Sequence, residues 1–125
     1  MHQLNIATQP VHETEIVQIE GAVDGNNFQS LSGLLVKHLK DCHTNGSLPR
    51  IVLDCSAISY IGSFELQEII DLAQRARAHG GDIKCAALLP TIEQVLNLIG
   101  HGESLDCQPT VRSALNAFQD SPVAA

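Results

Sequence analysis

Ser63 is the side chain in this sequence that is best placed to do chemistry. It follows Gly62 where an apolar stretch gives way to apolar residues at helical spacing, so we expect it at the cap or the first position of a helix. Free backbone N–H groups and the positive end of the helix dipole favour an acceptor or an anion there. Ser63 could simply cap the helix, or it could accept a phosphoryl group. Phosphorylation would add negative charge that the helix end tolerates and that a partner surface matched to a neutral hydroxyl would reject.

Other nucleophiles and bases form no recognisable catalytic motif. Neither a glycine-rich phosphate-binding motif nor a G-x-S-x-G turn occurs. A small hydrolase that used Ser63 or Cys55 would need a base, and none stands at a recognisable spacing. The histidines are scattered mostly over the expected ends of helices and strands, at positions 2, 12, 38, 43, 79 and 101. We therefore expect that the protein is not an enzyme.

The four cysteines indicate neither a metal site nor a disulfide framework. Cys42, Cys55, Cys85 and Cys107 include no C-x-x-C pair, and the adjacent Cys42–His43 pair has no second pair at zinc spacing. Cys55 and Cys85 lie in apolar, strand-like runs, where a reduced cysteine behaves as a small hydrophobic residue. We expect free thiols, no metal and no cofactor.

Composition narrows the partners. The chain has 125 residues, which is enough for one domain with its own core. Seven Lys and Arg against fourteen Asp and Glu give a net charge of −7, which disfavours nucleic acid and anionic membrane surfaces. No apolar run approaches the ~20 residues of a membrane span, and no basic-then-apolar leader is present. We expect a soluble, cytoplasmic protein.

Strand-like and helical segments alternate along the chain. Apolar patterns predict strands over 3–11, 14–23, 50–55, 82–89 and 105–108. They predict helices over 27–42, from 63 to the stop at 79–81, from 90 to 100, and over 111–118. Repeated strand–helix–strand crossovers require a mainly parallel sheet with helices packed on it. The prediction is one α/β domain over 1–125, in the order β-β-α-β-α-β-α-β-α, with a core over about 4–118 and a loose tail over 120–125.

The second predicted helix has one apolar face and one charged face. Its expected buried stripe comprises Phe64, Leu66, Ile69, Ile70, Ala73 and Ala76. Its expected solvent face comprises Glu65, Glu68, Asp71, Arg75 and Arg77.

Three segments together resemble STAS domains, specifically the stand-alone bacterial anti-sigma factor antagonists. They are residues 21–28 (GAVDGNNF), residues 51–56 (IVLDCS) with 60–63 (YIGS), and residues 80–85 (GGDIKC) through 95–100 (VLNLIG). The resemblance covers about 4–118, nearly the whole chain. It implies a mainly parallel, mixed β-sheet flanked by about four helices.

The resemblance also implies a function and a site. Members of the family bind an anti-sigma factor that is a serine kinase with an ATPase-type fold, and so release a sigma factor. The kinase phosphorylates the antagonist and ends the interaction, and a phosphatase restores it. By similarity Ser63 is the acceptor, and the partner-binding residues are Asp24, Asn26, Ser59, Gly62, Ser63, Phe64 and Glu65. A free monomer is expected.

The acceptor loop departs from the family pattern. Where relatives usually show D-S-S-G-L, D-S-T-G-L or S-S-A-G-L, this chain has Gly62-Ser63-Phe64-Glu65-Leu66. Glu65 could be a permanent mimic of the phosphorylated state, or an ordinary acidic residue that interacts with the helix dipole. Two alternative functions therefore stay open. The chain could be a small subunit of an ABC or anion transport complex, or a divergent STAS interaction module that is not phosphorylated.

Overall fold

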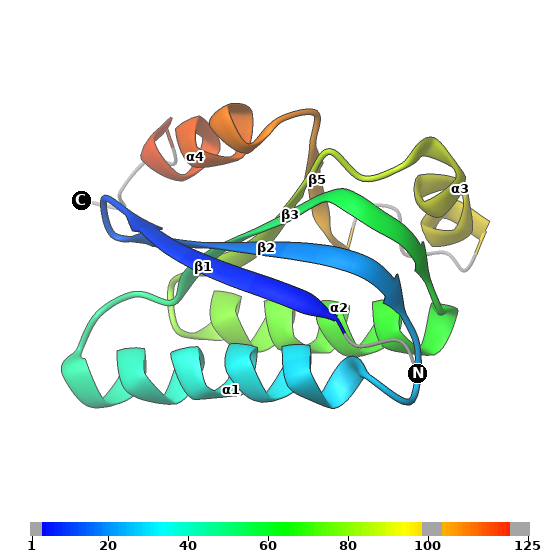
Figure 1. Cartoon of the computed structure of the whole chain (residues 1–125). Coiled ribbons are helices and arrows are strands. Elements are labelled where there is room, and N and C mark those ends of the chain that lie inside the picture. The colour runs from blue at the N-terminus through cyan, green and yellow to red at the C-terminus, as the bar shows by residue number, and fades with distance from the viewer. Residues whose placement is uncertain (1–3, 99–103, 121–125) are drawn as a thin grey trace.

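The computed structural model describes residues 4–98 and 104–120, which form one sheet with helices packed against it (Figure 1). The strands are β1 (Asn5–Val11), β2 (Thr14–Val23), β3 (Arg50–Ile61), β4 (Asp82–Ala86) and β5 (Asp106–Gln108). The helices are α1 (Phe28–Asn45), α2 (Ser63–Ala78), α3 (Pro90–Leu98) and α4 (Val111–Asp120). The predicted fold class and element order are confirmed. The predicted end of the third helix at 100 and the tail beyond 120 lie outside the described residues.

The strands lie side by side in chain order, β1-β2-β3-β4-β5. β1 pairs antiparallel with β2, and a turn at His12, with φ of 55°, joins the two. Every later pair is parallel and is joined through a helix. The carboxyl ends of β2, β3 and β4 therefore meet at one end of the sheet, and the segments that follow these strands gather there.

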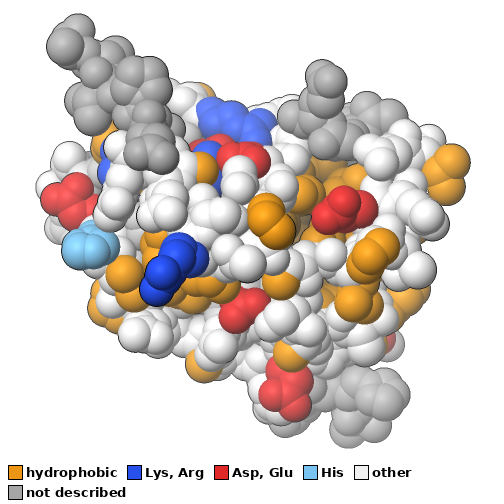
Figure 2. Space-filling model, turned by 90° about the horizontal axis from the view of Figure 1, so that it is seen from above, with side chains coloured by type: hydrophobic (Ala, Val, Ile, Leu, Met, Phe, Trp, Pro, Cys, Tyr) orange, Lys and Arg blue, Asp and Glu red, His pale blue; other side chains and the backbone are white. Residues whose placement is uncertain are grey.

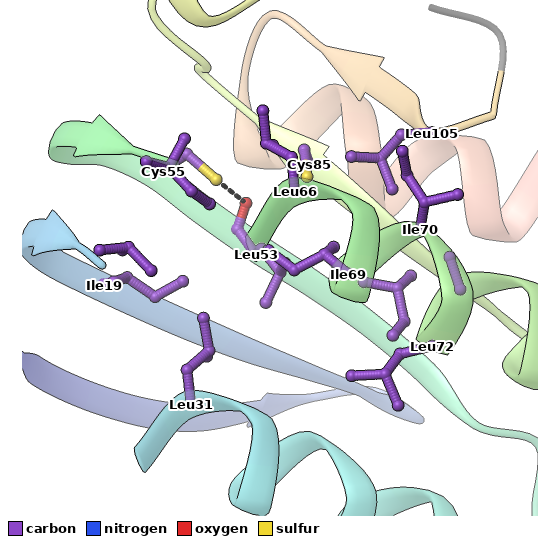
Figure 3. Packing of buried hydrophobic residues seen from close by; sticks show 14 of the residues in the cluster. Ile19, Leu31, Leu53, Cys55, Leu66, Ile69, Ile70, Leu72, Cys85 and Leu105 are labelled. Atoms are coloured by element: carbon purple, nitrogen blue, oxygen red, sulfur yellow. Dashed lines mark hydrogen bonds between the residues drawn. The ribbon is translucent and has the colours of Figure 1, made fainter. Parts of the chain in front are cut away.

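The sheet is covered on both faces, which explains its near-continuous apolar strands. Successive strand residues point to opposite faces. Val17, Leu53 and Cys85 belong to the main core with α1, α2 and α3, and Figure 3 shows part of this packing around Leu66 and Ile70 of α2. A smaller cluster packs under α4 on the other face and comprises Ile16, Val52, Ala86, Ala114 and Phe118. Figure 1 shows α1 and α2 below the sheet and α4 above it.

Strand β3 is longer than its apolar run predicts. The prediction ended the strand at 55, whereas β3 continues to Ile61 along β2 alone, since its pairing with β4 stops at Asp54. At two register shifts, β3 has one more residue than the β2 segment opposite it. The second shift lies beside Gly21, whose φ of 123° favours glycine. Such bulges bend a strand. Exposed polar residues in this half break the apolar pattern, which is why the pattern ended early.

Candidate partner-binding site

Ser63 begins helix α2 but does not cap it. The cap residue is Gly62, in an extended conformation and without a side-chain cap hydrogen bond. Ser63 is exposed, and its hydroxyl makes no hydrogen bond to any residue of the described ranges. The interpretation of Ser63 as the helix cap is therefore wrong. Its hydroxyl is left on the surface at the first position of the helix, where backbone N–H groups lack helical partners.

A second loop is fastened beside the start of α2. The backbone N–H of Gly62 donates to the carbonyl of Val23, 3.2 Å away, so the residues after β2 lie next to Gly62 and Ser63. Within this loop the Asp24 carboxylate accepts from the N–H of Asn26 at 2.9 Å. The tertiary structure thus brings Asp24 to the segment that carries Ser63, although the two residues are 39 positions apart in the sequence.

Asn27 fixes the conformation of this loop. It was not among the predicted site residues. Its side-chain oxygen accepts from the N–H of Asp24 at 2.9 Å, and its side-chain nitrogen donates to the carbonyl of Ala22 at 2.7 Å. Both groups belong to a residue that is 7% exposed. A buried side chain that ties both ends of a turn restricts its conformation. Asx chemistry over 24–27 was the available signal.

Two neighbouring residues of α2 have burial opposite to the prediction. Phe64 is 71% exposed and Glu65 is 7% exposed, whereas the apolar stripe placed Phe64 inside and Glu65 in water. The rest of the predicted stripe is buried: Leu66, Ile69, Ile70, Ala73 and Ala76. The stripe is therefore correct from the second turn onward and wrong in the first.

The missing side chain of Gly62 explains the burial of Glu65. A Cβ placed on Gly62 would overlap Oε1 of Glu65 and would lie 3.3 Å from its Cδ. The Glu65 carboxylate therefore folds back over Gly62, and the Tyr60 hydroxyl is 3.6 Å from the same point. A carboxylate in the first turn also interacts favourably with the helix dipole, typically by ~0.3–1 kcal/mol. Gly62 and Glu65 thus fit each other sterically.

Four large apolar side chains are exposed in β3, α2, α3 and the β4–α3 connection. Tyr60 is 56% exposed, Phe64 71%, Leu89 37% and Leu98 85%. Tyr60, Phe64 and Leu89 lie at or just after the carboxyl ends of β3 and β4, and α3, which ends with Leu98, lies at the same end of the sheet (Figure 1). Figure 2 shows hydrophobic side chains gathered at this end of the molecule. We call these four residues the apolar end surface. Of the four, only Phe64 was predicted as a site residue, and it was predicted to be buried. Exposed apolar groups of this kind mark interaction sites.

The remaining predicted site residues lie on the same segments. Ser59 is exposed at the second bulge of β3, one residue before Tyr60. Asn26 is exposed in the loop after β2. The structure therefore places all seven predicted residues on two adjoining segments, 24–26 and 59–65, with Gly62 and Glu65 contributing mainly from below the surface.

The cysteines and histidines form no metal centre within the described residues. Cys42 and His43 do not act together, because Cys42 Sγ lies 3.4 Å from Nε2 of His38 while His43 packs against His79. Cys85 and Cys107 are register partners on β4 and β5. Hydrogen bonding with Cys107 and Cys55, together with burial, raises the pKa of the Cys85 thiol well above its usual value. These thiols are free, and Figure 3 shows Cys55 and Cys85 in the core.

The fold and the sequence together define the family. The STAS domain model matches residues 5–114, and the chain belongs to this family. It is 24% identical over 102 residues to the anti-sigma-F factor antagonist RsfA of Mycobacterium tuberculosis, covering 82% of this chain and 77% of RsfA. No helix in the described ranges has the length and apolarity to cross a membrane.

Solved structures share the fold. An anti-sigma factor antagonist from Mycobacterium paratuberculosis superposes with a TM-score of 0.79 at 21% identity, covering 94% of this chain and 95% of that one. The antagonist SpoIIAA in its unphosphorylated form gives 0.71 at 15% identity, covering 92% and 96%. The phosphorylated form of SpoIIAA from Bacillus gives 0.67 at 14%, covering 90% and 98%.

Proposed function

We propose that this protein is an anti-sigma factor antagonist that binds an anti-sigma factor with serine kinase activity. The contact surface comprises the start of α2, the adjoining loop 24–26 and the apolar end surface. The observation that carries the proposal is the Ser63 hydroxyl, exposed at the first position of α2 and flanked by the exposed ring of Phe64. The names of RsfA and SpoIIAA, and the existence of a phosphorylated form of SpoIIAA, support it.

Phosphorylation of Ser63 would end the interaction by charge. A phosphoserine carries roughly 1.5–2 negative charges at neutral pH. In the free protein the N-terminus of α2 and the surrounding water stabilise that charge. In the complex the same charge would be buried beside Phe64 and Tyr60, where an unpaired charge is costly. A phosphatase would then restore binding.

The burial of Glu65 favours a structural role over permanent mimicry of phosphate. Its carboxylate lies back over Gly62, beneath the surface on which the Ser63 hydroxyl is exposed. A charge held there interacts with the helix end more than with a partner. We therefore propose a switch at Ser63 with Glu65 as its support.

The experiment is affinity capture from an extract of the native cell, using the wild type, Ser63→Asp and Ser47→Asp as parallel baits. Ser47 is exposed in the α1–β3 loop and supplies the same new charge at the other end of the molecule. We expect wild type and Ser47→Asp to retain an ATPase-type kinase identified by mass spectrometry, and Ser63→Asp to lose it. Equal retention by all three baits would contradict a switch at Ser63.

A direct assay then tests the chemistry. The captured kinase and ATP should raise the intact mass of the wild type by one phosphate and leave Ser63→Ala unmodified. Phosphate that remains on Ser63→Ala would place the acceptor elsewhere. Capture of transporter subunits in place of a kinase would reject the sigma-factor pathway and favour a transport subunit.

A further inference from the structure

The opposite end of helix α2 carries a cleft that the proposed function does not use. It lies between the carboxyl ends of α1 and α2 and the connection 46–49, which Figure 1 places away from α3. Its volume is about 560 Å³, within the range of small-molecule sites. Apolar atoms of Leu39, Leu48 and Pro49 line it, and Leu48 is 45% exposed there.

Four basic side chains line this cleft in an otherwise acidic protein. Lys40, His43, Arg75 and His79 line it, and no carboxylate does. Within residues 4–98 and 104–120, Lys40 and Arg75 form no ion pair, whereas the neighbouring Arg77 is paired with Asp82 at 2.8 Å. Basic residues in the last turn of a helix also stabilise its dipole. That effect accounts for Arg75 and for the lack of carboxylates at the two helix ends, but not for Lys40, which stands before the last turn of α1.

The two imidazoles are held in a defined arrangement. The rings of His43 and His79 meet edge to face with centroids 5.6 Å apart. Nδ1 of His79 is 2.9 Å from the carbonyl oxygen of Arg75. Because a carbonyl only accepts, Nδ1 is the donor in this contact and Nε2 is left for another partner; Nε2 can donate to an anion only when the ring carries both protons. This contact to the backbone of α2 therefore fixes the orientation of the His79 ring.

We infer that this cleft binds a small organic anion, a carboxylate or phosphate monoester on an apolar body. The anionic group would lie among Arg75, Lys40 and the imidazoles, and the apolar body against Leu39, Leu48 and Pro49. Charge complementarity supports this occupant, since the chain carries −7 overall and yet lines this cleft with Lys40 and Arg75 and with no carboxylate. The inference is independent of the proposed function, because it uses the other end of α2.

Titration of the full-length protein, followed by the shifts of its backbone amides in NMR, tests the inference. The probes are octanoate and 1-naphthyl phosphate, and octylammonium is the control with the same chain and opposite charge. We expect saturable binding of at least one anion, with shifts around 39–49 and 75–79, and none from octylammonium. Arg75→Gln should weaken anion binding about tenfold, as loss of a charge-assisted hydrogen bond does.

Arg77→Gln is the matched control, because it removes a charge from the same helical turn but does not line the cleft. It should bind the anions as the wild type does. Binding of neither anion, equal binding of octylammonium, or equal losses in both arginine variants would each overturn the inference.

Discussion

The two ends of helix α2 differ in shape and in charge. At its start, the exposed Phe64 follows the unpartnered Ser63 hydroxyl in the chain, and the nearby charges, Asp24 and Glu65, are acidic. At its end, a cleft is lined by Lys40, Arg75 and two histidines together with apolar residues, and by no carboxylate. Sixteen residues, about 24 Å of helix, separate them. Under the two proposals above, one helix serves two kinds of recognition, an apolar surface for a protein and a cleft for a small anion.

The two ends of α2 also differ in how tightly the surrounding atoms pack against a glycine, Gly62 at the start and Gly81 after the end. A Cβ on Gly81, after α2, would overlap the backbone carbonyl oxygen of Pro49. A Cβ on Gly62, before α2, would overlap only the end of the Glu65 side chain. Backbone cannot move away without disturbing the sheet, whereas a side chain can change rotamer. The carboxyl end should therefore be the less tolerant of the two.

The largest expected effect comes from Gly81→Ala. The overlap lies beside the hydrogen bond from the N–H of Asp82 to the carbonyl of Pro49, at 2.9 Å, so relief would break a contact that aligns β3 with β4. We expect the free energy of unfolding in urea to fall by about 3 kcal/mol. Gly33→Ala is the control, since nothing lies within 4 Å of its Cβ position in α1. That variant should gain about 0.5–1 kcal/mol, and equal behaviour of the two would contradict the packing argument.

Phe64→Ala and Leu48→Ala should separate the two recognition surfaces. Loss of an exposed aromatic anchor should weaken binding of the anti-sigma partner by about 2 kcal/mol, measured by calorimetry. Leu48→Ala should leave partner binding unchanged and weaken only binding of octanoate. Both side chains are exposed, so thermal melts should match the wild type. A comparable loss of partner affinity in both variants would show that the two surfaces are not separate binding sites.

Gly62→Ala should cost less, about 1 kcal/mol, because the Glu65 side chain can move aside. The double variant Gly62→Ala/Glu65→Ala removes the group that a new Cβ would meet. The cost of Gly62→Ala should therefore be smaller when Glu65 is already alanine, which a double-mutant cycle of urea unfolding measures. Additive effects of the two changes would show that Glu65 does not occupy the space above Gly62.

The smallest expected effect lies away from both ends of α2, under α4. Burial alone would raise the pKa of Asp106, but hydrogen bonds from Lys84, at 2.7 Å, and from Gln108 lower it overall. A carboxyl whose pKa is lowered by folding stabilises the protein above its ordinary pKa of about 4 and loses that contribution as the pH falls through the lower, folded value.

Asp106→Asn should therefore be less stable than the wild type at pH 7, by about 0.5 kcal/mol for this partly exposed pair. The difference should shrink in acid, below about pH 4, as Asp106 of the wild type becomes protonated. Urea unfolding across this pH range measures it. A difference that stays constant with pH would show that the ionised carboxylate does not carry the effect.

The order of elements could be predicted from the sequence because apolar spacing reports which face of each segment is buried. Helix α2 shows the limit of this method. The predicted buried stripe is correct from Leu66 onward. In the first turn the predicted burial of Phe64 and exposure of Glu65 are the reverse of what the structure has, because Phe64 was placed inside on its apolarity alone. No local sequence pattern predicts that the space above Gly62 accepts the Glu65 carboxylate. Similarly, strand β3 extends beyond its apolar run, because its pairing with β2 continues to Ile61.

The candidate site divides in the same way. Position along the chain was enough to place Ser63 at the start of a helix, because Gly62 and the apolar pattern mark that boundary by themselves. Only the tertiary structure brought Asp24 beside it and exposed the apolar end surface, through parallel pairing that aligns the ends of β2 and β3. It alone assembled the basic cleft, since Lys40 and Arg75 lie on different helices. Local sequence determines which residues begin and end each element, and long-range packing decides which ends meet.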